Sequence, residues 1–122
     1  MSHFARIGLL ALGLVSNAVP VGAQDAAQVA SYVYRVVFEN ERVRVLEAHY
    51  LVGGTSKMHA HPDSVIYVLE PGKIKMTLPD GETIDIEVQA SDVGKAFWQP
   101  ASSHSVQNVG PEHRVLVFEM KQ

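Results

Sequence analysis

The chain has no cysteine, no apolar run long enough to span a bilayer and no excess of positive charge. Without cysteine it cannot form disulfide bonds, so a small domain must be held together by its core, by a metal or by another copy of itself. The formal net charge of the 122 residues is −3 at pH 7. A mildly acidic chain has no electrostatic basis for binding nucleic acid or an anionic membrane, and we expect neither as a partner.

Residues 1–23 have the three-part form of a secretory signal peptide. A positively charged start with Arg6 precedes nine apolar residues, Ile7 to Val15, and small residues come before Gln24. The apolar part is too short to insert as a transmembrane helix, so the alternative is a buried N-terminal helix. We favour removal of this segment, which leaves 99 of the 122 residues and, without Arg6, 9 basic against 13 acidic side chains. The mature protein is then expected to be secreted or periplasmic.

The remaining sequence predicts a single all-β domain over 32–122, preceded by a flexible or loosely helical lead-in at 24–31. Apolar and charged residues alternate on both sides of Pro79-Asp80-Gly81. This pattern is typical of a β-hairpin with one apolar face, whose lysines and acids oppose one another across the strands. About eight short strands separated by turns, with no convincing amphipathic helix, indicate a sandwich or barrel. The expected strands are 32–38, 42–52, 65–69, 73–78, 83–88, 97–99, a segment around His104, and 113–120.

Two histidines one residue apart, His59 and His61, precede the apolar run 65–69. Alternate residues of an extended strand share a face, so both imidazoles can reach one ion. The spacing alone equally describes two exposed loop histidines. His104 strengthens the metal interpretation because it lies in a segment expected to form a neighbouring strand, and a divalent ion needs several converging ligands.

The other candidate side chains are expected to have structural roles. His49 and His113 stand alone, and we interpret them as surface or satisfied core histidines. Tyr67 and Trp98 are interpreted as aromatic residues of the core or of a cavity wall. The sequence assigns no catalytic residue.

The segments around these histidines resemble the two motifs of the cupin family. The first cupin motif is a glycine, five residues, His-x-His, three or four residues, a glutamate and, after six more residues, a glycine. The second is a glycine, five residues, Pro-x-Gly, two residues, a histidine, three residues and an asparagine. The stretch 53–72 resembles the first motif and 94–108 the second, with the predicted hairpin between them. The matching residues are Gly53, His59, His61, Gly72, Gly94, Pro100, His104 and Asn108.

This chain departs from the family pattern in two places. The glutamate of the first motif is absent, because Val65 and Ile66 occupy its positions, and Asp63 is the nearest carboxylate that could replace it. The second motif is one residue short and has Ser102 where glycine is usual. A site without the glutamate carries less negative charge, which predicts weaker binding of divalent ions.

The resemblance implies one cupin barrel, a jelly-roll-like double-stranded β-helix whose cavity holds a small molecule. It implies that His59, His61 and His104 bind a divalent metal: iron, manganese, nickel, copper or zinc. A metal-dependent, dioxygenase-like oxidoreductase is one expected function, and a non-catalytic module that binds a small ligand, with or without metal, is the alternative. Because small cupins commonly pair through sheet edges, a homodimer is also expected.

Overall fold

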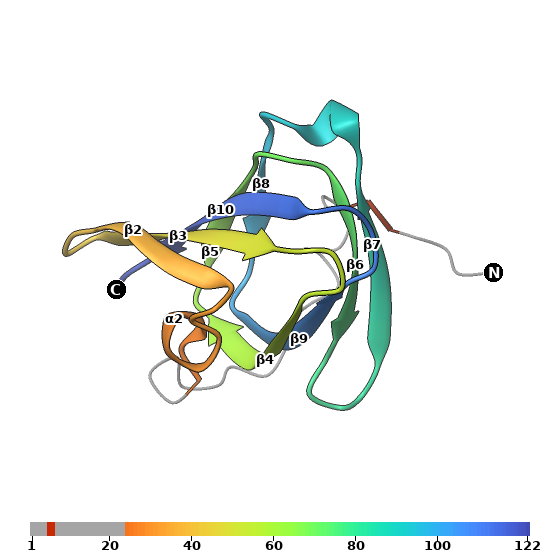
Figure 1. Cartoon of the computed structure of the whole chain (residues 1–122). Helices are drawn as coiled ribbons and strands as arrows, with labels where there is room; N and C mark the ends of the chain where they lie inside the picture. Colours follow the sequence, from red (N-terminus) through yellow and green to blue (C-terminus); the bar gives the residue numbers. More distant parts are fainter. Residues whose placement is uncertain (1–4, 7–23) are drawn as a thin grey trace.

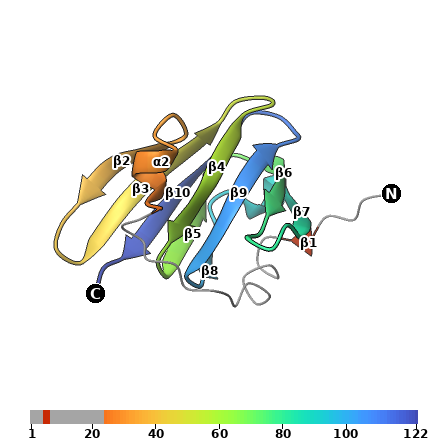
Figure 2. The same ribbon diagram turned by 90° about the horizontal axis from the view of Figure 1, so that it is seen from below.

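The structure is a computed structural model that describes residues 5–6 and 24–122. Two five-stranded sheets face one another, with strand orders β1-β7-β6-β9-β4 and β2-β3-β10-β5-β8 (Figures 1 and 2). The elements are β1 (Ala5–Arg6), α2 (Ala26–Val29), β2 (Tyr34–Glu39), β3 (Val43–Tyr50), β4 (Thr55–His61), β5 (Ser64–Val68), β6 (Gly72–Thr77), β7 (Thr83–Val88), η2 (Ala90–Asp92), β8 (Ala96–Gln99), β9 (Ser102–Asn108) and β10 (His113–Met120). The predicted all-β fold is confirmed.

The predicted signal peptide lies outside the described residues, apart from β1, whose backbone pairs in parallel with β7. No helix in the described ranges is long and apolar enough to cross a membrane.

The hairpin of β6 and β7 has the register that the alternation predicts. Lys73 lies opposite Glu87, and Lys75 lies opposite Asp85. Ile86 lies between Asp85 and Glu87, so its side chain is on the other face of the hairpin, where it is almost completely buried. Gly81 has a φ of 90°, a left-handed conformation that glycine adopts without steric strain, so the turn forms where the sequence predicts it.

The hydrophobic core fills the space between the two sheets. Leu46 and Val117 contribute to it from one sheet, and Ile86 and Val106 from the other. Alternate residues of β5 and β10 are buried, so each strand turns one face toward this core. The two sheets therefore enclose a common interior, into which side chains from β4 and β9 also point.

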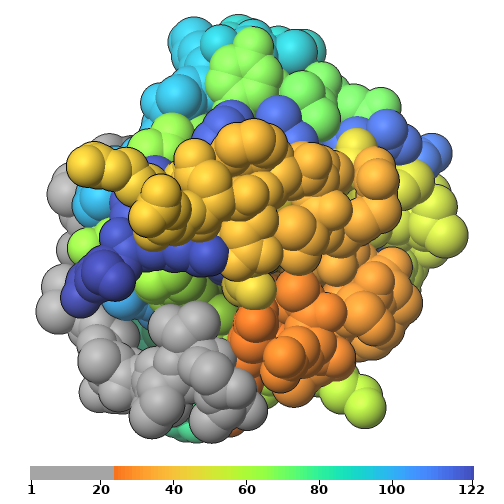
Figure 3. Space-filling model, turned by 90° about the vertical axis from the view of Figure 1, so that its left-hand side faces the viewer, coloured from red at the N-terminus to blue at the C-terminus, as the bar shows by residue number. Residues whose placement is uncertain are grey.

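Residues 24–31, for which we expected a flexible or loosely helical lead-in, contain the short helix α2 packed against the barrel. Ala26 and Ala30 are completely buried, and the backbone N–H of Ala60 donates a 2.7 Å hydrogen bond to the carbonyl of Gln24. In Figure 3 this segment, in orange, covers one side of the molecule next to β2 and β3. The alanines have no bulky side chains, so the short helix can pack closely on the barrel.

Candidate metal centre

Strands β4 and β9 bring three histidines together inside the barrel. His59 pairs directly with His104 in the antiparallel register, and His61 follows two residues later on β4. All three are buried, with exposures of 0 to 3%, and a possible ligand nitrogen from each lies within 4.8 Å of the others. The predictions that His59 and His61 share a face and that His104 lies on the neighbouring strand are confirmed.

The hydrogen bonds of the three rings leave one nitrogen of each available. Each Nδ1 faces an oxygen: the Lys57 carbonyl at 2.6 Å from His59, the Glu119 carboxylate at 2.6 Å from His61, and the Ser102 hydroxyl at 3.5 Å from His104. Nε2 of His59 is buried and has no hydrogen-bond partner within the described part of the chain. Such an atom is costly to bury unless something binds it.

The cluster fits a single metal ion after a small contraction. Two imidazole nitrogens bound to one ion at about 2.1 Å lie at most about 4.2 Å apart. The nitrogens of this cluster lie within 4.8 Å of one another, so binding one ion requires the rings to approach by a few tenths of an ångström. Among the described residues, the cluster consists of the histidines alone.

Burial keeps His59 and His104 in the neutral form that binds metals. Desolvation, together with the neighbouring His61, lowers the pKa of His59 to about 3. Desolvation also holds the pKa of His104 well below its usual range, with smaller effects from His59 and His61. Because a metal ligand must carry a free lone pair, these two rings need lose no proton to bind a metal at neutral pH.

The carboxylate nearest to the cluster is Glu119, which the sequence reasoning missed. One of its oxygens accepts the hydrogen bond from His61, and the side chain is 2% exposed. Asp63, our candidate replacement for the missing glutamate, does not belong to the cluster and instead accepts a 2.9 Å hydrogen bond from the backbone N–H of Ala101. The signal for Glu119 was present in the sequence, because it lies on the buried side of β10, four residues after Val115.

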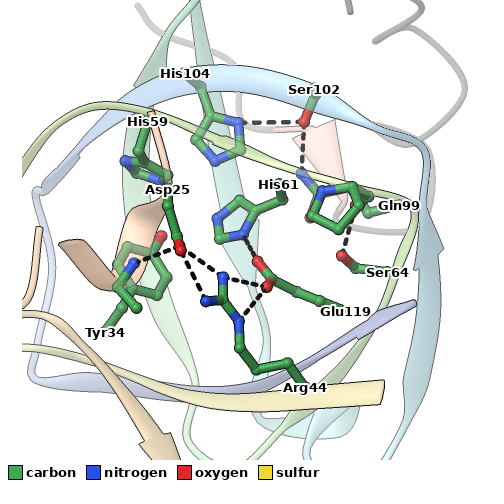
Figure 4. A network of polar contacts seen from close by, with 12 residues as sticks. Asp25, Tyr34, Arg44, His59, His61, Ser64, Gln99, Ser102, His104 and Glu119 are labelled. Atoms are coloured by element: carbon green, nitrogen blue, oxygen red, sulfur yellow. Dashed lines mark hydrogen bonds and ion pairs between the residues drawn. The ribbon is translucent and has the colours of Figure 1, made fainter. Parts of the chain in front are cut away.

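Arg44 and Asp25 continue this contact from Glu119 toward the segment before α2 (Figure 4). Arg44 donates to Glu119 through Nε at 2.9 Å and through Nη2 at 2.7 Å. It also donates to both carboxylate oxygens of Asp25, at 2.8 and 2.6 Å. A continuous chain of charged hydrogen bonds therefore runs from His61 to the segment before α2.

An aromatic ring closes the histidine cluster on another side. The ring centre of Tyr34 lies 4.8 Å from that of His59 and 5.2 Å from that of His61. Its hydroxyl shares a 3.1 Å hydrogen bond with Tyr50, which in turn lies 2.7 Å from the Ser56 hydroxyl. Burial, aided by Tyr50, raises the pKa of Tyr34 well above its usual value, so its hydroxyl stays protonated.

A small apolar cavity of about 80 Å³ extends from the cluster into the barrel. His61 and His104 line it, and Trp98, half-exposed on β8, lines it too, as expected for a cavity-wall residue. Most of the wall is aliphatic: Ala48, Ile66, Ile74, Met76, Ile86, Val88, Val106, Val115 and Val117. This cavity has room for a small, largely apolar molecule, and a second, more polar pocket of about 570 Å³ borders His61 on the side of Arg44 and Glu119.

The two other histidines in the described part of the chain lie outside the cluster, in the structural roles predicted for them. His49 is partly exposed and pairs with Glu112. His113 is buried and donates from Nδ1 to the Glu70 carbonyl at 3.0 Å. A Cβ on Gly72 would lie 2.6 Å from the His113 ring, so the glycine that closes the first motif makes room for this histidine.

Two facing sheets around a small cavity, with histidines on adjacent strands, define a cupin-like barrel. A cupin domain from Bordetella pertussis Tohama I is similar to this chain with a TM-score of 0.66 and 26% identity, over 74% of this chain and 93% of that domain. A cupin superfamily protein from Desulfitobacterium hafniense DCB-2 is similar with a TM-score of 0.53 and 16% identity, over 74% and 77% of the two chains. The cupin domain of Cnp3 from Schizosaccharomyces pombe is similar with a TM-score of 0.53 and 16% identity, over 73% of this chain and 64% of that chain. The sequence matches no protein-family model and no curated protein. The chain thus has the cupin fold.

Proposed function

We propose that this protein is a metal-binding cupin in which His59, His61 and His104 hold one divalent transition-metal ion. The observation that carries the proposal is the group of three buried imidazoles, one of them with a nitrogen that has no partner among the described residues. Imidazole ligands suit iron, nickel, copper and zinc, and manganese completes the set of candidates. Three protein ligands also leave coordination positions open for a small molecule.

We infer a dioxygenase-like oxidoreductase as the catalytic form of this function. A redox-active metal with open positions supplies the activation of dioxygen. The chain itself supplies a largely apolar compartment, because aliphatic side chains make up most of the cavity wall beside His61 and His104. At about 80 Å³, the cavity limits the substrate to a small molecule.

A non-catalytic ligand-binding module is the alternative function, and the cavity wall favours it in one respect. Among the described residues that line the cavity there is no carboxylate and no lysine, so outside the histidines few groups are suited to move a proton. Oxygen consumption by the metal-loaded protein with small thiols, phenols and enolisable ketones distinguishes the two functions. The catalytic form predicts uptake with at least one of them, whereas a binding module predicts binding without uptake.

Metal analysis of the purified full-length protein, prepared without a histidine tag, tests the proposed site. We expect close to one equivalent of metal, either as purified or after addition of the candidate ions. The His59→Ala/His61→Ala variant should contain almost none, because it lacks two of three ligands. His49→Ala, which removes a histidine outside the cluster, should retain the full content. An unaltered protein that takes up no ion would contradict the proposal.

A homodimer formed through β2 is the second part of the proposal. This edge strand exposes Val36, Val37 and Phe38 by 41 to 53%, and an uncovered apolar edge invites pairing. In an antiparallel pair centred on Val37, Arg35 of one copy would face Glu39 of the other. Light scattering over a range of concentrations should show a dimer that Val37→Lys converts to a monomer. A monomer at every concentration would refute this part.

Export remains a prediction that depends on residues 1–23, which lie outside the described part except for β1. If the segment is removed, the chain begins at Gln24, whose carbonyl is hydrogen-bonded to Ala60, between His59 and His61.

A further inference from the structure

A chain of charged hydrogen bonds links the histidine cluster to both sheets and to the N-terminal segment. His61 belongs to the sheet that contains β4. Glu119 and Arg44 belong to the other sheet, where they are direct cross-strand partners on β10 and β3. Asp25 precedes α2 and forms a parallel bridge with Ala60. The four side chains thus connect the two sheets and the N-terminal segment at one point.

Each side chain in this hydrogen-bonded series is held in place by the next one. Glu119 uses one oxygen for Nδ1 of His61 and the other for Arg44, so it cannot turn without breaking a contact. Arg44 in turn binds Asp25 through both terminal nitrogens. The hydrogen bond to Asp25 is the main cause that raises the pKa of Arg44. Burial opposes ionisation of Asp25, yet the hydrogen bond and charge of Arg44 lower its pKa overall.

Packing alone does not explain a buried charge chain. Glu119 is 2% exposed, and Arg44 and Asp25 are largely buried. Desolvating three charges is expensive, and apolar side chains of similar volume often give equal or greater stability. What the apolar alternative lacks is an acceptor for the Nδ1 proton of His61. With this proton held by Glu119, the lone pair on Nε2 is left for the cluster.

We propose that Glu119, Arg44 and Asp25 are positioning residues that orient His61 as a metal ligand, an inference that rests on the proposed metal-binding function. Glu119 holds the ring, Arg44 holds Glu119, and Asp25 fixes Arg44. The N-terminal segment therefore forms part of the metal centre. The arrangement also places a negative charge one hydrogen bond away from a ligand histidine, in a site that lacks the family's glutamate ligand.

Cobalt affinity of the full-length protein, measured by competition with a chelating dye, tests this inference. Glu119→Gln keeps the shape of the side chain but removes its charge, and we expect Co²⁺ binding to weaken by about 10- to 100-fold. Asp25→Asn keeps a good N-cap for α2, so the helix should persist. It acts through Arg44, and we expect a smaller loss of about three- to tenfold. Circular dichroism verifies that each variant is folded during the titration.

Glu47→Gln is the matched control, because Glu47 also lies on β3 and forms an ion pair, but with the exposed Arg35. Its Co²⁺ affinity should stay within about twofold of the unaltered protein. If Glu119→Gln does not fold, Asp25→Asn decides the question. Variants that fold and bind Co²⁺ as tightly as the control would overturn the positioning role and leave the metal site intact. An unaltered protein without Co²⁺ affinity would instead overturn the proposed function, and this inference with it.

Discussion

Replacing His104 with alanine is expected to weaken metal binding by about 100- to 1000-fold. Structural zinc sites with four ligands bind with about 10–16 kcal/mol, so one ligand is worth roughly 3–4 kcal/mol. That energy corresponds to two to three powers of ten in the dissociation constant. The effect should be large because His104 lies directly opposite His59 and is the single ligand from β9.

Thermal unfolding with and without Zn²⁺ measures this loss. An ion present at 100 times its dissociation constant stabilises the native state by about 2.7 kcal/mol, so the midpoint of the unaltered protein should rise. At the same concentration the midpoint of His104→Ala should rise far less, because the ion no longer exceeds its dissociation constant and stabilises the native state by at most about 0.4 kcal/mol. His113→Ala is the matched control, because His113 is equally buried but lies outside the cluster. It should begin less stable and still respond to Zn²⁺; an equal response in His104→Ala would exclude this residue as a ligand.

Acidification should destabilise the metal-free protein steeply below about pH 6.5, the ordinary pKa of histidine. Burial lowers the pKa of His59 to about 3 and that of His104 well below its usual range. Between these values and pH 6.5, the unfolded chain binds protons that the folded chain does not. Stability is therefore complete above pH 6.5 and is lost as the pH falls, at about 1.4 kcal/mol per pH unit for each group. His113, whose pKa is also lowered by burial, contributes in the same direction.

Urea unfolding in the presence of a chelator, from pH 7.5 to pH 5.0, checks this dependence. Two groups give a loss of about 4 kcal/mol by pH 5, a large part of the 5–15 kcal/mol that stabilises a typical domain. In His104→Ala one titrating group is removed, so the slope of the free energy of unfolding against pH should be shallower. A free energy that stays constant over this range would show that these histidines are not buried and neutral in the native state.

Local patterns in the sequence were enough to predict the hairpin and the shared face of His59 and His61. Alternation with a period of two describes how a strand presents its faces, so the opposition of lysines and acids across the hairpin followed from the sequence, while the structure supplied the individual pairs. The spacing between His59 and His61 depends on the same period. The match of His104 came from the resemblance to the second cupin motif, because β4 and β9 are distant in the sequence and a local period does not pair them.

The tertiary structure decided what no local pattern determines. The continuous apolar run at 65–69 does not reveal whether its odd-numbered or its even-numbered residues face inward. Pairing with β10 turned Ile66 and Val68 toward the core. The segment 24–31 is rich in alanine and polar residues, so nothing in its sequence indicated that Ala26 and Ala30 are buried. Their burial depends on the surface of β4, which forms only in the folded barrel. Asp25, Arg44 and Glu119 lie far apart in sequence, and their charges are paired only after both sheets have formed. The period of a sequence pattern describes the faces of one strand, whereas an ion pair between strands depends on which strands the tertiary structure brings together.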